Sequence, residues 1–357
     1  MYLYNKRKIS ELLNTVQALK DIITDDTDDS FSCPYDKLII CSEELPSQEF
    51  LDIIKPAMYQ TEDDETHYRY RLVYELFSVQ WKQVNPKAAT TSIMLNPWKH
   101  RLTPAAVLKI IDFIIGSHHF AYVVKSDDKV DYLHTITSKE LSKCLFVGYQ
   151  KKPPTNYMML DQTFLYGKSK GQQVKNYDKA EEQGISEITW TRVEKTRKIR
   201  DKNARPTIFQ FLFDDRADAL KNMLVVDTER FSGRDKIIRR IKKYGTFQAA
   251  YMSLNAQEKR KLRNHEAFKS PKMNLFEAFR TDLDIWLSTS PILRLMKMNL
   301  DAVEKSWSNQ DISYTTDLKV NPICSEYNQI TTSLIGFNKV YSLTRSSHFS
   351  EHVIPIY

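Results

Sequence analysis

The sequence predicts an α+β protein in which an antiparallel-sheet domain is followed by a helical, basic domain. Up to about residue 215, short segments typical of strands outnumber helical segments, which favours an antiparallel sheet over a doubly wound one. From about residue 216 the apolar residues recur with the period of a helix. Acidic runs lie at 25–29 and 62–66, whereas the segment after residue 190 is strongly basic. This asymmetry indicates that the later part of the chain contacts a polyanion.

The composition is that of a folded protein. The chain has 357 residues, enough for two or three domains, and 41% of them are hydrophobic. The longest apolar stretches, such as 110–115, are too short to span a membrane, and the N-terminal segment has no apolar core of a signal peptide. The four cysteines form no CxxC pair, which favours a reducing compartment. We therefore expect a cytoplasmic protein without a membrane partner. The motifs GxGxxG and GxxxxGK(S/T) are absent, which excludes the usual dinucleotide-binding enzymes and P-loop motors.

Seven segments of the first domain have the aromatic, β-branched or alternating character of strands. They are 36–45, 69–81, 90–96, 118–125, 163–167, 172–179 and 188–198. Thr103 and Pro104 open a helix as its N-cap and first residue, and Gly116 ends that helix. A short helix is expected near 137–144. The strands that flank KSKG are predicted to form a hairpin.

The later part of the chain is predicted to be a helical, basic module. Between residues 229 and 263, basic side chains greatly outnumber acidic ones. The helix at 232–245 has a buried isoleucine stripe and ends at Gly245, and Asn255 caps a later helix, a spacing that allows a helix-turn-helix-like arrangement. We expect an N-terminal helix and acidic linker at 1–34, the sheet domain at 35–215, the helical domain at 216–300 and an irregular segment at 301–357.

Candidate chemistry centres on a tyrosine in the predicted hairpin. Side chains repeat with period two along a strand, so Arg192 and Glu194 point the same way, and Lys179 shares the face of Tyr177 if its strand continues. A phenol with a pKa near 10 is a poor nucleophile unaided. Attack on a phosphodiester becomes feasible if a divalent metal neutralises the phosphate and a cation stabilises the phenolate. Carboxylates such as Glu194 suit Mg²⁺ or Mn²⁺, whereas the histidines form no metal-binding motif. On the residues alone, an ordinary amphipathic edge strand accounts better for this pattern.

A run of motifs in the first domain resembles the replication initiation factor family, the rolling-circle initiators of plasmids and phages. The family has a hairpin of the form Y-x-G-S-(R/K)-K-S, then Y-(D/N)-K-x-x-E, then R-x-E about ten residues on. The corresponding residues are Tyr166, Gly167, Lys168 and Ser169; Tyr177, Asp178, Lys179 and Glu182; and Arg192 and Glu194. Upstream, MLNPWK (94–99) resembles the N-P-x-K strand end of the family. The resemblance covers roughly residues 36–215.

This resemblance implies a ferredoxin-like, Rep-type nicking domain followed by a winged-helix or helix-turn-helix-like domain. Tyr177 would attack one strand at an origin, form a 5′-phosphotyrosine and free a 3′-OH, with Lys179 and Arg192 as catalytic partners. Glu194 and Glu182 would hold Mg²⁺ or Mn²⁺. We align the family's R-x-D-x-A-x-D strand with HHFAYVVKSDD, which lacks the arginine and the first aspartate, so the remaining candidate ligands are Asp127 and Asp128.

The implied partners are origin DNA, as duplex and as extruded single strand, and a separate host helicase, because the chain has no P-loop. A homodimer is left open. The basic side chains expected to contact DNA lie in the hairpin, at the end of the R-x-E strand and on the later helices. They are Lys168, Lys170, Lys195, Arg197, Lys198, Arg234, Arg239, Arg240, Lys242, Lys243, Lys259, Arg260, Lys261 and Arg263.

Two alternatives use the same residues differently. A non-catalytic origin-binding protein or repressor would use the basic helices and treat Tyr177 as a structural residue. A mobilisation relaxase or transposase would share the tyrosine chemistry but act on another target.

Overall fold

The computed structural model describes residue 16 and residues 31–290, except for 55–58, 61–67, 151, 153, 157–162, 168–172, 186, 214–219 and 234. The described residues belong to one compact unit, Met1–Asp301, and the second unit, Ala302–Tyr357, lies outside them. The predicted N-terminal helix and the predicted irregular C-terminal segment therefore fall outside the described residues.

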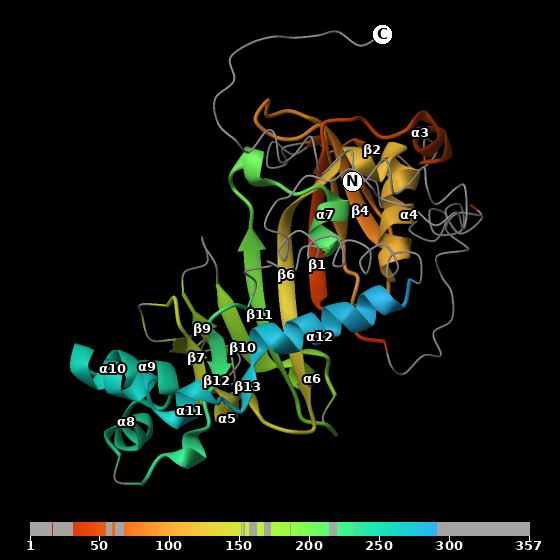
Figure 1. Ribbon diagram of the computed structural model, residues 1–357. Coiled ribbons are helices and arrows are strands. Elements are labelled where there is room, and N and C mark those ends of the chain that lie inside the picture. Colours follow the sequence, from red (N-terminus) through yellow and green to blue (C-terminus); the bar gives the residue numbers. More distant parts are fainter. Residues whose placement is uncertain are drawn as a thin grey trace, which may run out of the picture. The chain divides into compact units, whose positions relative to one another are not determined.

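One large antiparallel sheet dominates the described part of the chain (Figure 1). Its ten strands have the order β2-β3-β4-β5-β1-β6-β11-β10-β9-β8. Their bounds are β1 (Tyr35–Ser42), β2 (Tyr59–Gln60), β3 (Tyr68–Val73), β4 (Phe77–Gln83), β5 (Thr91–Leu95), β6 (Ala121–Leu133), β8 (Thr155–Asn156), β9 (Phe164–Tyr166), β10 (Val174–Asp178) and β11 (Trp190–Lys198). A smaller sheet has the order β13-β12-β7, from β7 (Leu145–Val147), β12 (Met223–Val225) and β13 (Met273–Asn274). The predicted α+β class with an antiparallel sheet is confirmed.

Helices connect and cover these strands. In the sheet region they are α3 (Gln48–Ile54), α4 (Pro104–Ile115), α5 (Ser138–Ser142), α6 (Lys179–Glu182) and α7 (Ile208–Phe213). Later come α8 (Lys236–Tyr244), α9 (Phe247–Met252), α10 (Ala256–Arg263), α11 (Glu266–Lys269) and α12 (Leu275–Ser288). Short 3₁₀ turns lie at η2 (His118–Phe120), η3 (Lys202–Ala204) and η4 (Thr228–Arg230). None of the described helices is long and apolar enough to cross a membrane.

The predicted caps of α4 are confirmed. Thr103 Oγ1 accepts a hydrogen bond from the backbone N–H of Ala106 at 3.2 Å, and Pro104 occupies the first turn, where no donor is lost. Gly116 ends the helix in the left-handed region with φ 83°, a conformation that glycine adopts without steric cost. Helix α4 links β5 to β6, which lie on either side of β1 and pair with it in antiparallel fashion.

Three predicted strand boundaries are wrong. The segment predicted as one strand at 69–81 forms β3 and β4 with a turn between them. The strand predicted at 118–125 begins later, because His118–Phe120 form η2 with Ser117 as its cap. It also runs on to Leu133. The strand was predicted to end at residue 125 because the residues that follow are charged. These charged residues remain in a strand because side chains of β11 form ion pairs and hydrogen bonds with them.

The main core lies against one face of the large sheet. The ring of Tyr35 on β1 lies 5.2 Å from that of Phe211 on α7, and 5.7 and 5.5 Å from those of Phe279 and Trp286 on α12. The indole of Trp286 donates to the carbonyl of Leu102 at 2.8 Å, so its only polar atom is satisfied in the core. This packing on one face leaves the other face for polar side chains.

Helices α8 to α11 surround a second cluster of apolar side chains. Phe146 of β7 packs edge-on against Phe247, Tyr251 and Phe268. Gln248 of α9 accepts from the backbone N–H of Val147 at 3.0 Å, which fastens the helices to β7. Helix α12 packs in the main core, whereas α8 to α11 form a separate apolar core. The domain boundary expected near residue 216 stays a prediction.

Candidate active site on the central sheet

Three neighbouring strands, β6, β11 and β10, carry polar side chains on the face opposite the main core. Arg192 of β11 pairs directly with Tyr177 of β10 on one side and with Asp131 of β6 on the other. Glu194 pairs in the same way with Lys175 and Lys129. Directly opposed residues of antiparallel strands share a face, so these side chains form two adjacent rows. The prediction that Arg192 and Glu194 point the same way agrees with this register.

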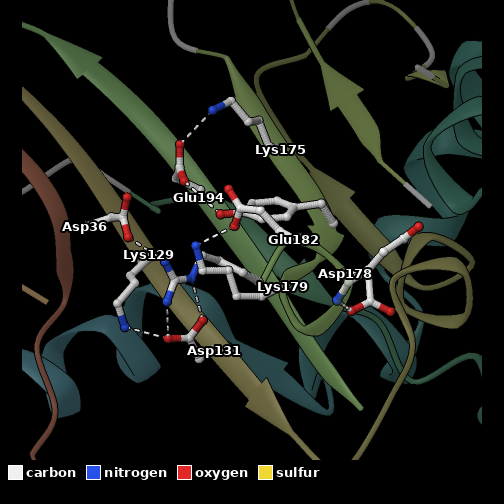
Figure 2. A network of polar contacts seen from close by, with 11 residues as sticks. Asp36, Lys129, Asp131, Lys175, Asp178, Lys179, Glu182 and Glu194 are labelled. Carbon is white, nitrogen blue, oxygen red and sulfur yellow. Dashed lines mark hydrogen bonds and ion pairs between the residues drawn. The ribbon is translucent and has the colours of Figure 1, made fainter. Parts of the chain in front are cut away.

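We call this group the sheet cluster (Figure 2). Its members share the polar face of the sheet or reach it from the adjoining strand and helix. They are Asp36, Lys129, Asp131, Lys175, Tyr177, Lys179, Glu182, Arg192 and Glu194.

Tyr177 forms a hydrogen bond with a carboxylate. Its hydroxyl donates to Glu194 Oε2 at 3.2 Å, and Lys175 Nζ donates to the other oxygen of Glu194 at 2.9 Å. The tyrosine is only 8% exposed. Burial raises the pKa of Tyr177, and the negative charge of Glu194 raises it further. The phenol is therefore neutral at physiological pH, and Glu194 is the group in contact that can accept its proton.

Arg192 is completely buried and fully engaged. Its Nε and one terminal nitrogen donate to the two oxygens of Asp131 at 2.7 and 3.0 Å, and the other terminal nitrogen donates to Asp36 at 2.5 Å. The guanidinium also lies 4.2 Å from the ring centre of Trp98. Burial by itself would lower the pKa of Arg192, but Asp131 outweighs it and the pKa is raised. Arg192 is thus fixed in place by ion pairs.

Asp131 is held as a carboxylate by two cations. Burial by itself would raise its pKa, but Lys129 and Arg192 together lower the pKa of Asp131 to about 2. Lys129 Nζ lies 2.6 Å from Asp131 Oδ2. A buried carboxylate with two charged partners is a strongly coupled group, because removal of either partner leaves a charge without compensation.

Lys179 lies in the sheet cluster, but it extends from helix α6 and not from the strand on which it was predicted. Strand β10 ends at Asp178, whose side chain caps α6 by accepting from the backbone N–H of Glu181 at 3.0 Å. Lys179 is the first residue of α6 and forms an ion pair with Glu182. Its Nζ lies 5.5 Å from the ring centre of Trp98 and 5.9 Å from that of Tyr177. The three predicted catalytic residues Tyr177, Lys179 and Arg192 therefore lie in one cluster.

The predicted metal ligands do not all converge. Asp128 is fully buried on the opposite face of β6, where Arg197 lies 3.3 Å away, and burial raises its pKa. The prediction that Asp128 could join Glu194 is therefore wrong, since adjacent residues of a strand point to opposite faces. Asp127 lies on the face of the sheet cluster, but it pairs with Lys125 at 3.1 Å and accepts from Thr196 at 2.7 Å.

The donor set of the sheet cluster does not fit a divalent metal in the observed arrangement. Each of its carboxylates already pairs with a lysine or arginine: Glu194 with Lys175, Asp131 with Lys129 and Arg192, Asp36 with Arg192, and Glu182 with Lys179. Across the residues that the structure describes, no group of three or more His, Cys, Asp or Glu side chains could hold a metal ion. The hard oxygen ligands that Mg²⁺ requires are thus committed to cations of the chain.

Sequence reasoning missed Asp36, Lys129, Asp131, Lys175 and Trp98. The signal for two of them was present, because Lys125, Asp127, Lys129 and Asp131 recur at period two. This is the spacing of the R-x-D-x-A-x-D pattern, with lysine in the first and fifth positions. The pattern was aligned with residues 118–128, several residues before the segment 125–131 that fits it, because the strand was expected to end at residue 125. Trp98 lies within the MLNPWK segment noted above, although no role was predicted for it, and Asp36 comes from another part of the sequence and carries no local signal.

A second group of charged side chains lies on α8 and α10, and we call it the basic helix surface. All of its members are exposed and have no carboxylate partner among the described residues. They are Arg239, Lys242, Lys243, Arg260 and Lys261. Such unpaired, exposed cations are available to phosphates. Helix α9 between them has four buried residues out of six and no charge, so it cannot act as an exposed recognition helix of a helix-turn-helix.

The remaining residues of the predicted DNA surface differ in accessibility. Arg240 donates to the carbonyl and hydroxyl of Ser253, and Arg263 donates to the hydroxyl of Tyr251 at 2.7 Å. Lys259 lies 5.6 Å from the ring centre of Tyr251, and Lys198 is exposed at the end of β11. The residues Lys168, Lys170 and Arg234 lie outside the described ranges.

Two residues of that predicted surface point to the core face of the sheet, Lys195 buried and Arg197 partly buried. Lys195 is only 1% exposed, with its Nζ 5.0 Å from the ring centre of Tyr149. Arg197 pairs with Asp128 and lies 4.7 Å from the ring centre of Phe211. Both side chains point to the core face of β11, because they alternate with Arg192 and Glu194. The prediction that Lys195 contacts DNA is wrong, since a buried cation does not reach a phosphate. Arg197 is committed to Asp128 on the same face, so the prediction is wrong for it as well.

Comparisons with known proteins give one distant structural likeness. No protein-family model matches the sequence, and no curated protein matches it significantly. Among solved structures, the chain is similar to a rolling circle replication initiator protein from Geobacillus stearothermophilus. The likeness covers 59% of this chain and 91% of that chain, with 11% sequence identity and a TM-score of 0.36. A likeness this distant says nothing of residue roles, which rest on the geometry described above.

Proposed function

We propose that this protein initiates rolling-circle replication by nicking and rejoining one DNA strand at an origin, with Tyr177 as the nucleophile. The observation that carries the proposal is the hydrogen bond from the Tyr177 hydroxyl to Glu194, on a sheet face rich in cations. The sequence motifs around Tyr177, Lys179, Arg192 and Glu194 support the same reaction. A nucleophile bonded to a base that a third group orients is the general arrangement of an activated nucleophile.

The proposed reaction transfers a phosphoryl group from DNA to the tyrosine and back. Glu194 accepts the phenol proton while Tyr177 Oη forms a bond to phosphorus and the bond from phosphorus to the 3′ oxygen breaks. The departing oxygen takes a proton from water and becomes a free 3′-OH, and the 5′ phosphate stays on the tyrosine. Rejoining reverses these steps. One phosphoester bond replaces another, so resealing needs no nucleotide, in keeping with the absence of a P-loop.

The surroundings of Tyr177 suit this role in two respects. Its raised pKa keeps the phenol neutral, so a base in contact is needed for attack. Lys175, which contacts Glu194, is 39% exposed at its side chain. Lys175 can contact a phosphate that approaches Tyr177. Arg192 is held by Asp131 and Asp36 and fixes the row of side chains that contains Tyr177. Positive charge beside the phosphate stabilises the charge that develops during transfer.

DNA binding is assigned to the basic helix surface in the same proposal. The exposed, unpaired cations of α8 and α10 support contacts with the phosphates of duplex DNA. A separate helicase partner follows from the absence of an ATP-binding motif in the sequence. Residues 168–172 join β9 to β10, so the strand that carries Tyr177 follows a lysine-containing segment that was also predicted to contact DNA.

A second candidate is a non-catalytic DNA-binding protein. The observation that favours it is the low exposure of Tyr177, whose hydroxyl already has a hydrogen-bond partner. In that case the Tyr177–Glu194 bond stabilises the sheet, and the basic helix surface performs the whole function.

Nicking of plasmid DNA distinguishes the two candidates. Supercoiled plasmid that carries the protein's own origin is incubated with wild-type protein, with Tyr177→Phe and with the control Tyr70→Phe, whose ring lies on β3 stacked against Trp81. Each is assayed with Mn²⁺ and with EDTA. The proposal expects nicked circles from the wild type and the control and none from Tyr177→Phe. Nicking by Tyr177→Phe at the wild-type rate, or DNA binding without any nicking by the wild type, would favour the alternatives.

A further inference from the structure

Two tryptophans and a leucine form an apolar group beside the sheet cluster, and we call Trp98, Trp190 and Leu133 the tryptophan patch. Trp190 is the first residue of β11 and pairs directly with Leu133 of β6. Because side chains repeat with period two along a strand, both lie on the same sheet face as Arg192. Trp98 lies in the turn that follows β5, and its ring centre is 5.4 Å from that of Trp190.

All three members of the tryptophan patch are in contact with solvent. Trp98 and Trp190 are partly exposed, and Leu133 is 51% exposed. The other two tryptophans that the structure describes, Trp81 and Trp286, are buried in the main core. An apolar group that stays exposed on a polar sheet face is a candidate for binding a partner.

The tryptophan patch adjoins the proposed nucleophile. Arg192 pairs directly with Tyr177, and its guanidinium lies 4.2 Å from the ring centre of Trp98 and 5.6 Å from that of Trp190. Lys179 Nζ lies between the same two regions, 5.5 Å from the ring centre of Trp98 and 5.9 Å from that of Tyr177. A nucleotide next to a phosphate at Tyr177 would therefore be within reach of the patch.

The chemistry of this surface suits unpaired bases. Proteins hold single-stranded nucleic acid by stacking successive bases on aromatic side chains, while cations contact the backbone. Lys99 follows Trp98 directly, is exposed and has no carboxylate partner among the described residues, so it can contact a phosphate there. In a duplex the neighbouring base pairs cover both faces of each base. Only unpaired nucleotides can therefore stack on the tryptophan patch.

We propose that the tryptophan patch stacks against unpaired bases of the DNA strand whose phosphate lies at Tyr177. The inference rests on the proposed function for its place beside a nicking centre, and it adds that the substrate presents unpaired nucleotides there. Trp98 also covers the guanidinium of Arg192. Its test must therefore separate contacts with bases from effects on the ion pairs of Arg192.

Two probes that differ only in their bases make this separation. Fluorescence anisotropy measures binding of the purified, full-length protein to a labelled oligothymidylate of about 12 nucleotides, within the site sizes of single-strand binding proteins. The second probe is an abasic backbone with the same number of phosphates. We expect the wild type to bind the oligothymidylate at least about tenfold more tightly than the abasic backbone, because several bases can stack.

The variants assign this difference to the tryptophan patch. Trp98→Leu and Trp190→Leu should each bind the oligothymidylate about fivefold or more weakly, the loss expected for one stacking side chain, and should bind the abasic backbone as the wild type does. Trp190→Phe keeps a ring and should lose less than Trp190→Leu. The control is Phe120→Leu, an aromatic residue that is 58% exposed just before β6. It should match the wild type on both probes.

Equal wild-type affinity for the two probes would overturn the inference, because bases would then contribute nothing. Folded leucine variants, checked by circular dichroism, that bind the oligothymidylate like the wild type would overturn it too. An equal loss on both probes would also contradict it, since the tryptophans would then act through the ion pairs of Arg192. If neither leucine variant folds, quenching of wild-type tryptophan fluorescence decides: the oligothymidylate should quench it and the abasic backbone should not, and quenching by neither would refute the inference.

The proposed function fails separately from this inference. Plasmid nicking is assayed in parallel with the binding titrations. A preference for the oligothymidylate that depends on Trp98 and Trp190, together with no nicking under any condition, would support the tryptophan patch and count against the proposed reaction.

Discussion

The sheet cluster and the basic helix surface both contain several lysines and arginines, but they hold them in opposite ways. In the sheet cluster, Arg192 and Lys129 are buried and each contacts a carboxylate. On the basic helix surface, Lys242 and Arg260 are exposed and have no carboxylate partner among the described residues. Lysine and arginine side chains are therefore held in place by ion pairs in the sheet cluster, whereas they remain available to a binding partner on the basic helix surface.

This difference shows that charge content does not identify a phosphate-binding site. Of the cations predicted to bind DNA, Lys195 is buried and Arg197 is 13% exposed at its side chain, and both lie on the core face. The cations of the basic helix surface on α8 and α10 are exposed. Exposed charges contribute little to stability, whereas a buried charge that loses its partner is costly. Substitutions in the two regions should therefore affect different measurements.

The largest effect is expected from Glu194→Gln in the sheet cluster. Glutamine has nearly the same shape and keeps an acceptor for Tyr177, but it cannot take up the phenol proton. General-base catalysis contributes about 10²- to 10⁴-fold, so nicking should slow by that factor. DNA binding should change little. Single-turnover nicking and a filter-binding titration measure the two quantities.

The control for this variant is Glu187→Gln, an exposed residue shortly before β11. It should nick DNA at the wild-type rate. If Glu194→Gln also nicks at the wild-type rate, Glu194 does not accept the proton, and the Tyr177–Glu194 contact has only a structural role.

Arg192→Met is expected to have the second largest effect, on stability. Asp131 and Asp36, whose side chains are 16% and 28% exposed, lose the buried cation that they share. Breaking a buried pair by removal of one member costs about 3–5 kcal/mol, and the partial exposure of both carboxylates places the loss near the lower end of that range. The matched substitution Arg260→Met on the basic helix surface should change stability by no more than about 0.5 kcal/mol. Urea unfolding measures both free energies. Equal effects of the two substitutions would contradict the contrast between the regions.

Charge reversal on α8 should weaken DNA binding without loss of stability. The triple variant changes Arg239, Lys242 and Lys243 to glutamate, and leaves out Arg240 because that side chain contacts Ser253. Each lost phosphate contact lowers the log–log salt slope by about 0.9 for B-DNA. The slope should therefore fall by up to about 2.7, the sum for three contacts.

A triple reversal on the sheet region provides the matched control. It changes Lys87, Lys109 and Lys139, which are exposed but lie outside α8 and α10. The control should bind DNA with a salt slope closer to that of the wild type, although the change in net charge is the same. Equal slopes in the two triple variants would place the DNA surface elsewhere.

The smallest effect is expected from Asp128→Asn. Burial raises the pKa of Asp128, and the one ion pair that it forms among the described residues is with Arg197, at 3.3 Å. Its replacement removes this one pair, so it should cost less stability than the replacement of Asp131, which has two charged partners. Asp131→Asn should cost more, because Arg192 and Lys129 would lose their shared partner. A thermal unfolding series that ranks the two variants in the reverse order would refute this account of the two faces of β6.

The sequence predicted the fold class, and the grouping of Tyr177, Lys179, Arg192 and Glu194, better than it predicted the surroundings of these four residues. The period of two along β11 was enough to place Arg192 beside Glu194, and the caps of α4 were readable from Thr103 and Gly116. Strand β6 was cut short because its charged residues look like a loop when their partners on β1 and β11 are unknown. Asp36 joins the sheet cluster, and Trp98 packs against it, only through contacts between segments that are distant in sequence. No local pattern could show that Lys195 is buried or that the carboxylates are already paired.

The most direct test of the account is to identify the residue that becomes attached to DNA. Wild-type protein is incubated with an oligonucleotide from its origin, labelled on the 3′ side of the nick, and the denatured complex is digested and analysed by mass spectrometry. The account predicts a nucleotide joined through phosphate to Tyr177, and no attached label in Tyr177→Phe. Attachment to another tyrosine, or cleavage of the oligonucleotide with no covalent adduct, would contradict it.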